Sequence, residues 1–215
     1  MIRLYSYWRS SAAYRVRLGL HVKRLPFEYV AVDLRDGRGP ANPAYLALNP
    51  QALVPTLVVD GMAIGQSLAI LEYLDERYPA PPLLCADPLE RARARQISLA
   101  IAADLHPLNN LRVLGYLEDA FDADKPGRMA WYHHWLRLGL DAAERLVHPD
   151  GPYAMGTQLG LADLFIVPQL YNARRFGFPL DDYPRLVRID GVCARLDAFV
   201  QALPERQPDA PGEGS

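Results

Sequence analysis

The chain has 215 residues, of which half are hydrophobic and 22% are charged, and its formal net charge is −2. That composition is typical of a folded globular protein, and the nearly balanced charge excludes the basic surface expected of a protein that binds nucleic acid or an anionic membrane. Its two cysteines have no metal-binding or CxxC spacing. Because neither a signal peptide nor a long apolar run is present, we expect a cytoplasmic protein with reduced thiols.

Strand and helix patterns alternate over about the first 80 residues, which is typical of a mixed α/β layer. Residues 2–7 and 27–32 predict strands, and residues 14–20 predict an amphipathic helix. Residues 35–42 read as a polar loop rich in glycine and proline, and residues 43–48 predict a short helix.

The stretch "PTLVVDGMAIG" gives the clearest local prediction. Two apolar runs flank Asp60-Gly61, a pair that suits a type I′ hairpin turn because both turn residues need a positive φ. Ser67 then begins a predicted helix that runs to about Tyr78. We therefore expect two antiparallel strands followed by a helix.

A proline-rich connector at residues 78–88 follows, and every periodic segment after it is helical. The helical part begins with "DPLE", in which Asp87 is the predicted N-cap of a capping box. We expect an α/β domain at residues 1–81 and an all-helical domain at residues 87–203. The polar, proline-rich end at residues 204–215 is expected to be disordered.

Three features are predicted within the helical part. One long helix over residues 91–117 should be kinked at Pro107, because proline removes a backbone hydrogen bond. A later helix begins with Gly160 as N-cap and Asp163 at its third position. A core stripe at helical spacing comprises Trp131, Trp135, Leu138, Ala142 and Leu146.

Two hydroxyl groups, those of Ser10 and Ser11, stand directly before the first predicted helix, with Arg9 in front of them. Short polar residues at that point ordinarily cap a helix. The N-terminus of a helix also stabilises an anion, so the same residues could hold a negatively charged reactant. From this stretch alone, both interpretations stay open.

Gln66 and Ser67 form a second such helix start, which suits a carboxylate but is equally explained by an ordinary cap. Between the two starts, Val54-Pro55 precedes a strand. If that bond were cis, the Val54 backbone could pair with an extended peptide, although a trans proline is the simpler interpretation. Two anion-binding helix starts with Val54-Pro55 between them describe a groove for a short anionic peptide.

Five stretches together resemble the zeta-class glutathione transferases, the family that includes maleylacetoacetate isomerase and, close by, maleylpyruvate isomerase. They are "YSYWRSSAAYRVRLGL", "LNPQALVPTLVVDG", "IGQSLAILEYLDERYP", "DLHPLNNLRVL" and "LADLFIVPQLYNARRF". The resemblance runs from about Ile2 to Gln207. It implies an α/β plus all-α fold class: a thioredoxin-like N-terminal domain that binds glutathione, followed by a helical C-terminal domain. It also implies a homodimer.

The resemblance gives roles to residues of the first domain. It implies a cis bond at Val54-Pro55, with the Val54 backbone pairing to the cysteinyl residue of glutathione. It implies that Gln66 and Ser67 hold the γ-glutamyl carboxylate. It also implies that Ser11, or alternatively Ser10, faces the sulfur.

Two positions depart from the family pattern, which reads Ser-Ser-Cys-Ser where this chain has Ser10, Ser11, Ala12 and Ala13. The site therefore lacks a protein thiol, as does the maleylpyruvate branch. Because the attacking sulfur in this chemistry belongs to glutathione, we expect activity to be retained.

The implied activity is a glutathione-dependent cis–trans isomerisation of maleylacetoacetate, or of maleylpyruvate, to the fumaryl isomer by reversible addition of the thiolate. A zeta-class transferase that conjugates or dehalogenates α-halo acids is an alternative that uses the same pocket. A non-catalytic glutathione-binding module is a second alternative.

The substrate of the isomerase is a small dicarboxylate keto acid, which cations should hold. Arg9 and Arg175 are the candidates for binding its carboxylates, with Arg112 as a further candidate, because guanidinium binds carboxylate in a bidentate manner. His106 and Asn110 are four residues apart, so they are predicted to share a helix face near glutathione. His106 could also donate to the sulfur or to the reacting substrate. We expect no metal, nucleic-acid or membrane partner.

Overall fold

The computed structural model describes residues 1–34 and 42–211. These form two compact units, one of residues 1–82 together with the chain from Arg195 onward, and the other of residues 83–194. Within the described ranges, no helix has the length and hydrophobicity needed to span a bilayer. The loop predicted at residues 35–42 lies outside the described residues except for its last position.

The first unit is built on a four-stranded sheet. Its strands are β1 (Arg3–Ser6), β2 (Glu28–Ala31), β3 (Thr56–Val59) and β4 (Met62–Gly65). They lie in the order β2-β1-β3-β4, with β1 parallel to β2 and antiparallel to β3. Strands β3 and β4 form a hairpin in which φ is 50° at Asp60 and 81° at Gly61, so the predicted turn with two positive φ angles is confirmed.

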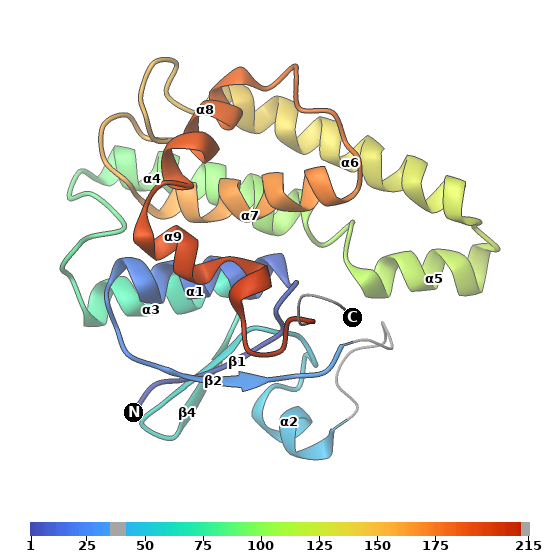
Figure 1. Ribbon diagram of the computed structural model, residues 1–215, viewed down its shortest axis with the longest axis horizontal. Helices are drawn as coiled ribbons and strands as arrows, with labels where there is room; N and C mark the ends of the chain where they lie inside the picture. The colour runs from blue at the N-terminus through green and yellow to red at the C-terminus, as the bar shows by residue number, and fades with distance from the viewer. Residues whose placement is uncertain (35–41, 212–215) are drawn as a thin grey trace. The chain divides into compact units, whose positions relative to one another are not determined.

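Helices cover both faces of this sheet (Figure 1). On one side lie α1 (Ser11–Val22), α3 (Ser67–Arg77) and α9 (Asp197–Ala202), and on the other lies α2 (Pro43–Leu48). The larger core packs α1 and α3 on the sheet through Ile2, Leu4, Val16, Leu20, Leu57, Val59, Ile70 and Leu74. A smaller cluster toward α2 consists of Tyr7, Val32, Tyr45 and Val54. A mixed sheet with helices on both faces is the thioredoxin-like arrangement that the resemblance implied.

The second unit is helical, as expected, which confirms the α/β plus all-α fold class. Its helices are α4 (Pro88–Leu99), the π-helix η1 (Ala100–Leu105), α5 (Leu111–Phe121), α6 (Lys125–Leu146), α7 (Leu161–Arg175) and α8 (Pro184–Cys193). The predicted start of α4 is confirmed, because the side chain of Asp87 accepts a hydrogen bond from Glu90 N–H at 2.9 Å.

The prediction of one long helix over residues 91–117 is wrong. The regular helix α4 changes to the π-helix η1 and then to turns that contain Pro107, before α5 begins. The side chain of Asn110 caps α5 by accepting from Arg112 N–H at 3.1 Å. Because proline cannot continue the hydrogen-bond ladder and asparagine supplies a new helix start, the chain restarts here instead of bending.

The predicted core stripe of α6 is also wrong, since Leu138 is 51% exposed and Leu146 is 38% exposed. The face that η1 covers includes Gly139, where an added Cβ would clash with the side chain of Leu105. This close approach places the core on a neighbouring face of the helix. The buried residues of α6 are Tyr132, Leu136, Leu140 and Ala143.

The C-terminal segment differs from the expected disordered tail over its described part, residues 204–211. The short helix η2 (Pro204–Arg206) follows α9, and the side chain of Gln207 donates to two carbonyl groups at the end of α9. Asp209 accepts hydrogen bonds from two other residues of the first unit. The polar composition of this segment led to the prediction of disorder. Composition alone does not show that the side chains of Gln207 and Asp209 have hydrogen-bond partners. Residues 195–203, which the sequence placed with the helical domain, belong to the first unit because α9 packs on α1.

The start of α7 confirms the predicted capping residues. The buried carboxylate of Asp163 accepts from Gly160 N–H at 2.8 Å and also from Ala154 N–H at 2.7 Å, which ties the preceding loop to the helix. Burial raises the pKa of Asp163 to about 7, and the backbone N–H donors oppose this rise only in part.

This raised pKa predicts a pH-dependent stability. The folded protein retains a proton that the unfolded chain releases above the ordinary pKa of 3.8, so the contribution of Asp163 to the free energy of unfolding falls as the pH rises toward 7. Asp163→Asn cannot titrate. From pH 5 to pH 8, the unfolding free energy of the wild type should fall relative to this variant by on the order of 2 kcal/mol, as measured by denaturant titration. A difference that does not change with pH would contradict the assignment.

Candidate active site

Helix α1 begins just after β1 leaves the sheet, and the two predicted serines lie at this point. Ser10 is the N-cap, and its Oγ accepts a hydrogen bond from Ala13 N–H at 3.2 Å. The cap uses only an oxygen lone pair, so the hydroxyl hydrogen of Ser10 can still be donated. Ser11 is the first residue of the helix and is buried. The guanidinium of Arg9 lies over the ring of Trp8, 4.7 Å from its centroid.

Helix α3 begins without a side-chain cap. Gln66 occupies the N-cap position with φ 64°, and its amide donates to Gln51 Oε1 at 3.0 Å instead of bonding to the helix. Ser67, the first helical residue, accepts at its Oγ from Arg15 Nη1 at 3.3 Å. Because an arginine can only donate, the hydroxyl hydrogen of Ser67 can still be donated to another acceptor. N–H groups that no side chain caps, next to such a hydroxyl, suit a carboxylate.

Val54-Pro55 lies between these two helix starts in the sequence, and its peptide bond is cis, as the resemblance implied. The preceding carbonyl, that of Leu53, accepts from Tyr45 Oη at 2.6 Å and from Asn49 Nδ2 at 2.8 Å. In the part of the chain that the structure describes, no backbone–backbone hydrogen bond outside the helices and strands involves Val54.

Two arginines of α1 are almost fully buried in the first unit, with Arg15 1% and Arg17 0% exposed. Arg17 donates to Ser6 Oγ at 3.2 Å and to the carbonyls of Tyr7 at 3.4 Å and Trp8 at 3.0 Å, just before α1. Burial lowers the pKa of Arg15 to about 9, which leaves it charged at neutral pH. Neither arginine is predicted from the sequence as a functional residue. The only signal was a pair of charges within the otherwise apolar helix "YRVRLGL".

The structure brings the predicted residues of the first unit into one connected region. Ser10 N–H donates to the Tyr7 carbonyl at 3.0 Å, and Tyr7 packs in the same cluster as Val54. Arg15 joins α1 to Ser67 at the start of α3. Arg15 thus links α1 to the start of α3, and Val54 packs in the same apolar cluster as Tyr7, just before α1.

Three predicted residues of the second unit follow η1. His106 is the C-cap of η1, and its backbone N–H donates to Ile101 O at 2.8 Å. Asn110 caps α5, and Arg112 is exposed in the first turn of that helix. His106 and Asn110 therefore do not share a helix face, contrary to the prediction, because the intervening residues form turns.

Arg175 is the last residue of α7 and is exposed, with its guanidinium 4.8 Å from the centroid of the Phe176 ring. Its positive charge opposes the rise in the pKa of Tyr132 that burial causes. The neighbouring Arg174 forms an ion pair with Asp190 at 2.6 Å. Of the two adjacent arginines at the end of α7, Arg174 therefore already has a carboxylate partner in the same unit.

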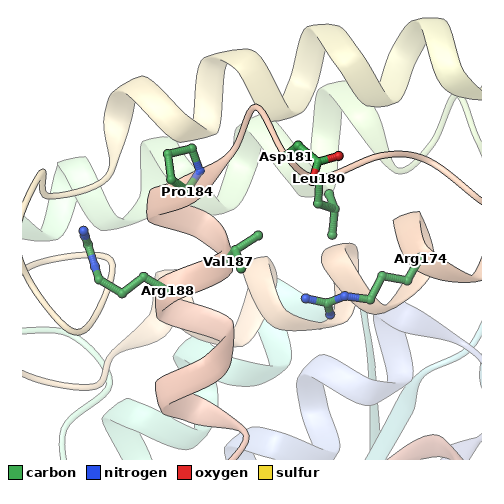
Figure 2. A pocket seen from close by; sticks show the side chains of 6 residues that line it. All are labelled: Arg174, Leu180, Asp181, Pro184, Val187 and Arg188. Carbon is green, nitrogen blue, oxygen red and sulfur yellow. The ribbon is translucent and has the colours of Figure 1, made fainter.

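A shallow depression of about 570 Å³ lies in the second unit beside α8 (Figure 2). Its lining includes Arg174 and Arg188, together with Leu180, Asp181, Pro184 and Val187. Arg174 is paired with Asp190, and Arg188 donates to three backbone carbonyls at 2.9–3.1 Å. Because Arg174 is already paired with a carboxylate and each nitrogen of the Arg188 guanidinium already donates to a carbonyl, neither group is fully available to a ligand.

Comparison with known proteins gives a consistent result. Residues 4–82 match the glutathione S-transferase N-terminal domain. The chain is 46% identical to a probable maleylacetoacetate isomerase of Vibrio cholerae, over 96% of this chain and 97% of that protein.

Two solved structures extend the likeness to the whole fold. A holo maleyl pyruvate isomerase, described as a bacterial zeta-class glutathione S-transferase, is 42% identical with a TM-score of 0.92, covering 97% of this chain and 100% of that one. A maleylacetoacetate isomerase from Anaeromyxobacter dehalogenans with bound glutathione is 44% identical with a TM-score of 0.86, covering 98% of each chain.

The burial of Arg15 leads to a prediction about stability. Arg15→Met keeps most of the side-chain volume but removes the buried charge and its desolvation cost. We expect the free energy of unfolding of the ligand-free protein to be unchanged or to rise by about 1–2 kcal/mol, as measured by denaturant titration. A large decrease would show that the guanidinium is needed mainly to hold the fold together.

Proposed function

Because this chain belongs to the zeta-class glutathione S-transferases, the family of the maleylacetoacetate isomerases, we propose that it is a glutathione-dependent isomerase of a maleyl keto acid. Maleylacetoacetate and maleylpyruvate are both candidates, since relatives named for each are similar to it over almost their whole length. The observation that carries the proposal is the pair of helix starts in the first unit. Each start has a serine hydroxyl, and the hydroxyl of Ser67 accepts a hydrogen bond from the buried Arg15.

The residues of the first unit fit glutathione. The start of α3 has no side-chain cap, and Ser67 receives a hydrogen bond from Arg15, so this point suits the γ-glutamyl carboxylate, with Gln66 beside it. The Val54 backbone would pair with the cysteinyl residue of the tripeptide, as the family resemblance implies. Pro55 fixes the start of β3 next to it.

When bound, glutathione would supply a thiolate that adds reversibly to the cis double bond of the substrate and so allows rotation about it. The protein's task is to keep that sulfur ionised. The N-terminus of α1 and the hydroxyl of Ser11, or alternatively that of Ser10, would donate to it, which favours the charged form. Since Ala12 and Ala13 bring no thiol, these donors are the chain's own contribution at the sulfur.

The substrate's carboxylates would be held by cations. We assign this role to Arg9, which is oriented by the Trp8 ring, and to Arg175 at the end of α7, with Arg112 as a further candidate. His106 would donate a hydrogen bond to glutathione or to the reacting carbonyl group. Asn110 could contact glutathione only through atoms that its capping role leaves available.

A direct assay tests the function. Purified protein with catalytic amounts of glutathione should convert the ultraviolet spectrum of maleylacetoacetate, of maleylpyruvate, or of both to that of the fumaryl isomer, and the total glutathione should remain constant. S-methylglutathione, which has no free thiol, should not replace it. No change with either substrate would refute the isomerase, whereas consumption of glutathione with dichloroacetate would favour the alternative of a conjugating or dehalogenating transferase. Binding of glutathione without either reaction would favour the second alternative, a non-catalytic glutathione-binding module.

The serines can be tested within this assay. Replacing both Ser10 and Ser11 with Ala should lower kcat at least about tenfold, because donors that stabilise the thiolate are lost. The single variant Ser11→Ala keeps the N-cap at Ser10 and so separates the loss of a donor from the loss of helix stability. Unchanged rates in the double variant would remove both residues from the mechanism.

The chain is further proposed to act as a cytoplasmic homodimer. Helix α5 supports the homodimer, because none of its residues is buried and three apolar side chains are 45–67% exposed. They are Leu111, Tyr116 and Phe121. Sedimentation of the purified protein as a monomer would contradict the dimer.

A further inference from the structure

The C-terminal segment reaches the loop that precedes α1. One carboxylate oxygen of Asp209, Oδ2, accepts a hydrogen bond from Trp8 N–H at 3.1 Å, and the other, Oδ1, accepts from Tyr29 Oη at 2.6 Å. Burial and the hydrogen bond to Asp209 both raise the pKa of Tyr29, so this hydroxyl remains a donor at neutral pH. Asp209 is thus held by Tyr29 and in turn holds the backbone of Trp8.

The other side of the same residue is held by Arg17. Arg17 Nη2 donates to the Trp8 carbonyl at 3.0 Å, and Arg17 Nε donates to the carbonyl of Ala202 at the end of α9 at 3.2 Å. Both polar groups of the Trp8 backbone therefore have charged partners, which make stronger hydrogen bonds than neutral groups do. One partner, Asp209, comes from the C-terminal segment, and the other also binds α9.

The segment that carries Asp209 is itself anchored. Gln207 Nε2 donates to the carbonyls of Gln201 at 3.1 Å and Leu203 at 2.7 Å. Pro204 is buried, and Ala210 N–H donates to the Gln207 carbonyl at 3.0 Å. The position of Asp209 therefore follows from a built turn and does not depend on the carboxylate alone.

We propose that Asp209 is a positioning residue for the loop of residues 7–10 that precedes α1, acting through the Trp8 backbone on Arg9 and Ser10. This inference rests on the proposed function of that loop. Arg9 is oriented by the Trp8 ring, and the Ser10 N–H donates to the carbonyl of Tyr7. A displacement of Trp8 would therefore move both Arg9, which is proposed to bind a substrate carboxylate, and Ser10, which is a candidate donor to the sulfur. The anchor at Ser67 lies on another helix and does not depend on Asp209.

The test compares Asp209→Ala, Asp209→Asn and Tyr29→Phe with Arg206→Ala, an exposed residue of the same segment, as the matched control. Asp209→Ala should lower kcat about tenfold or more, because small displacements of reacting groups are costly, while KM for glutathione should change less than threefold. Asp209→Asn should recover part of the rate, since its amide oxygen can accept from Trp8 while its NH2 donates to Tyr29. Arg206→Ala should match the wild type.

Hydrogen exchange provides a readout that does not need turnover. Asp209→Ala should increase the amide exchange rate of Trp8 at least about tenfold without a comparable increase in the core strand β3. Tyr29→Phe should give a smaller effect of the same kind. If kcat and Trp8 exchange are unchanged, or if exchange rises equally throughout the unit, Asp209 is not a positioning residue. Because hydrogen exchange is measured on the protein alone, its result does not depend on whether the isomerase assay succeeds.

Discussion

The positive charge buried in α1 is the constraint on which the proposed anion-binding region of the first unit depends. Arg15 and Arg17 are enclosed between the sheet and the neighbouring helices, where an uncompensated charge costs several kcal/mol. Arg17 reaches back to the carbonyls before its own helix, and Arg15 reaches the hydroxyl that begins α3. Charge, helix N–H groups and hydroxyl groups thus gather at the end of the sheet where β1 leads into α1 and β4 leads into α3, and this region favours an anion.

The same residues serve both the fold and the proposed chemistry. Ser10 caps α1 through an oxygen lone pair and keeps its hydrogen for a ligand, so the cap and anion-binding interpretations are compatible. With alanines at positions 12 and 13, the chain offers donors and charge but no nucleophile of its own. In the proposed enzyme, reactivity therefore comes from the bound tripeptide, and the fold contributes the environment that keeps its thiol ionised.

The sequence predicted those features of the fold that depend on a few adjacent residues. The Asp60-Gly61 turn and the caps at Asp87 and Asp163 follow from rules that involve a few adjacent residues, and all three are confirmed. The roles of Arg15 and Asp209 depend on partners 52 and 201 residues away, which no pattern of neighbouring residues encodes. The core face of α6 was misjudged for a similar reason, since η1 selects that face by packing against Gly139.

The central claim is that donors at the start of α1 keep the sulfur of bound glutathione ionised. The most direct test is a titration of the ultraviolet absorbance of the thiolate in the complex of glutathione with the protein. The account predicts a thiol pKa at least about one unit below that of free glutathione, and a return toward the free value when Ser10 and Ser11 are both alanine. A bound thiol with the same pKa as the free tripeptide would contradict it.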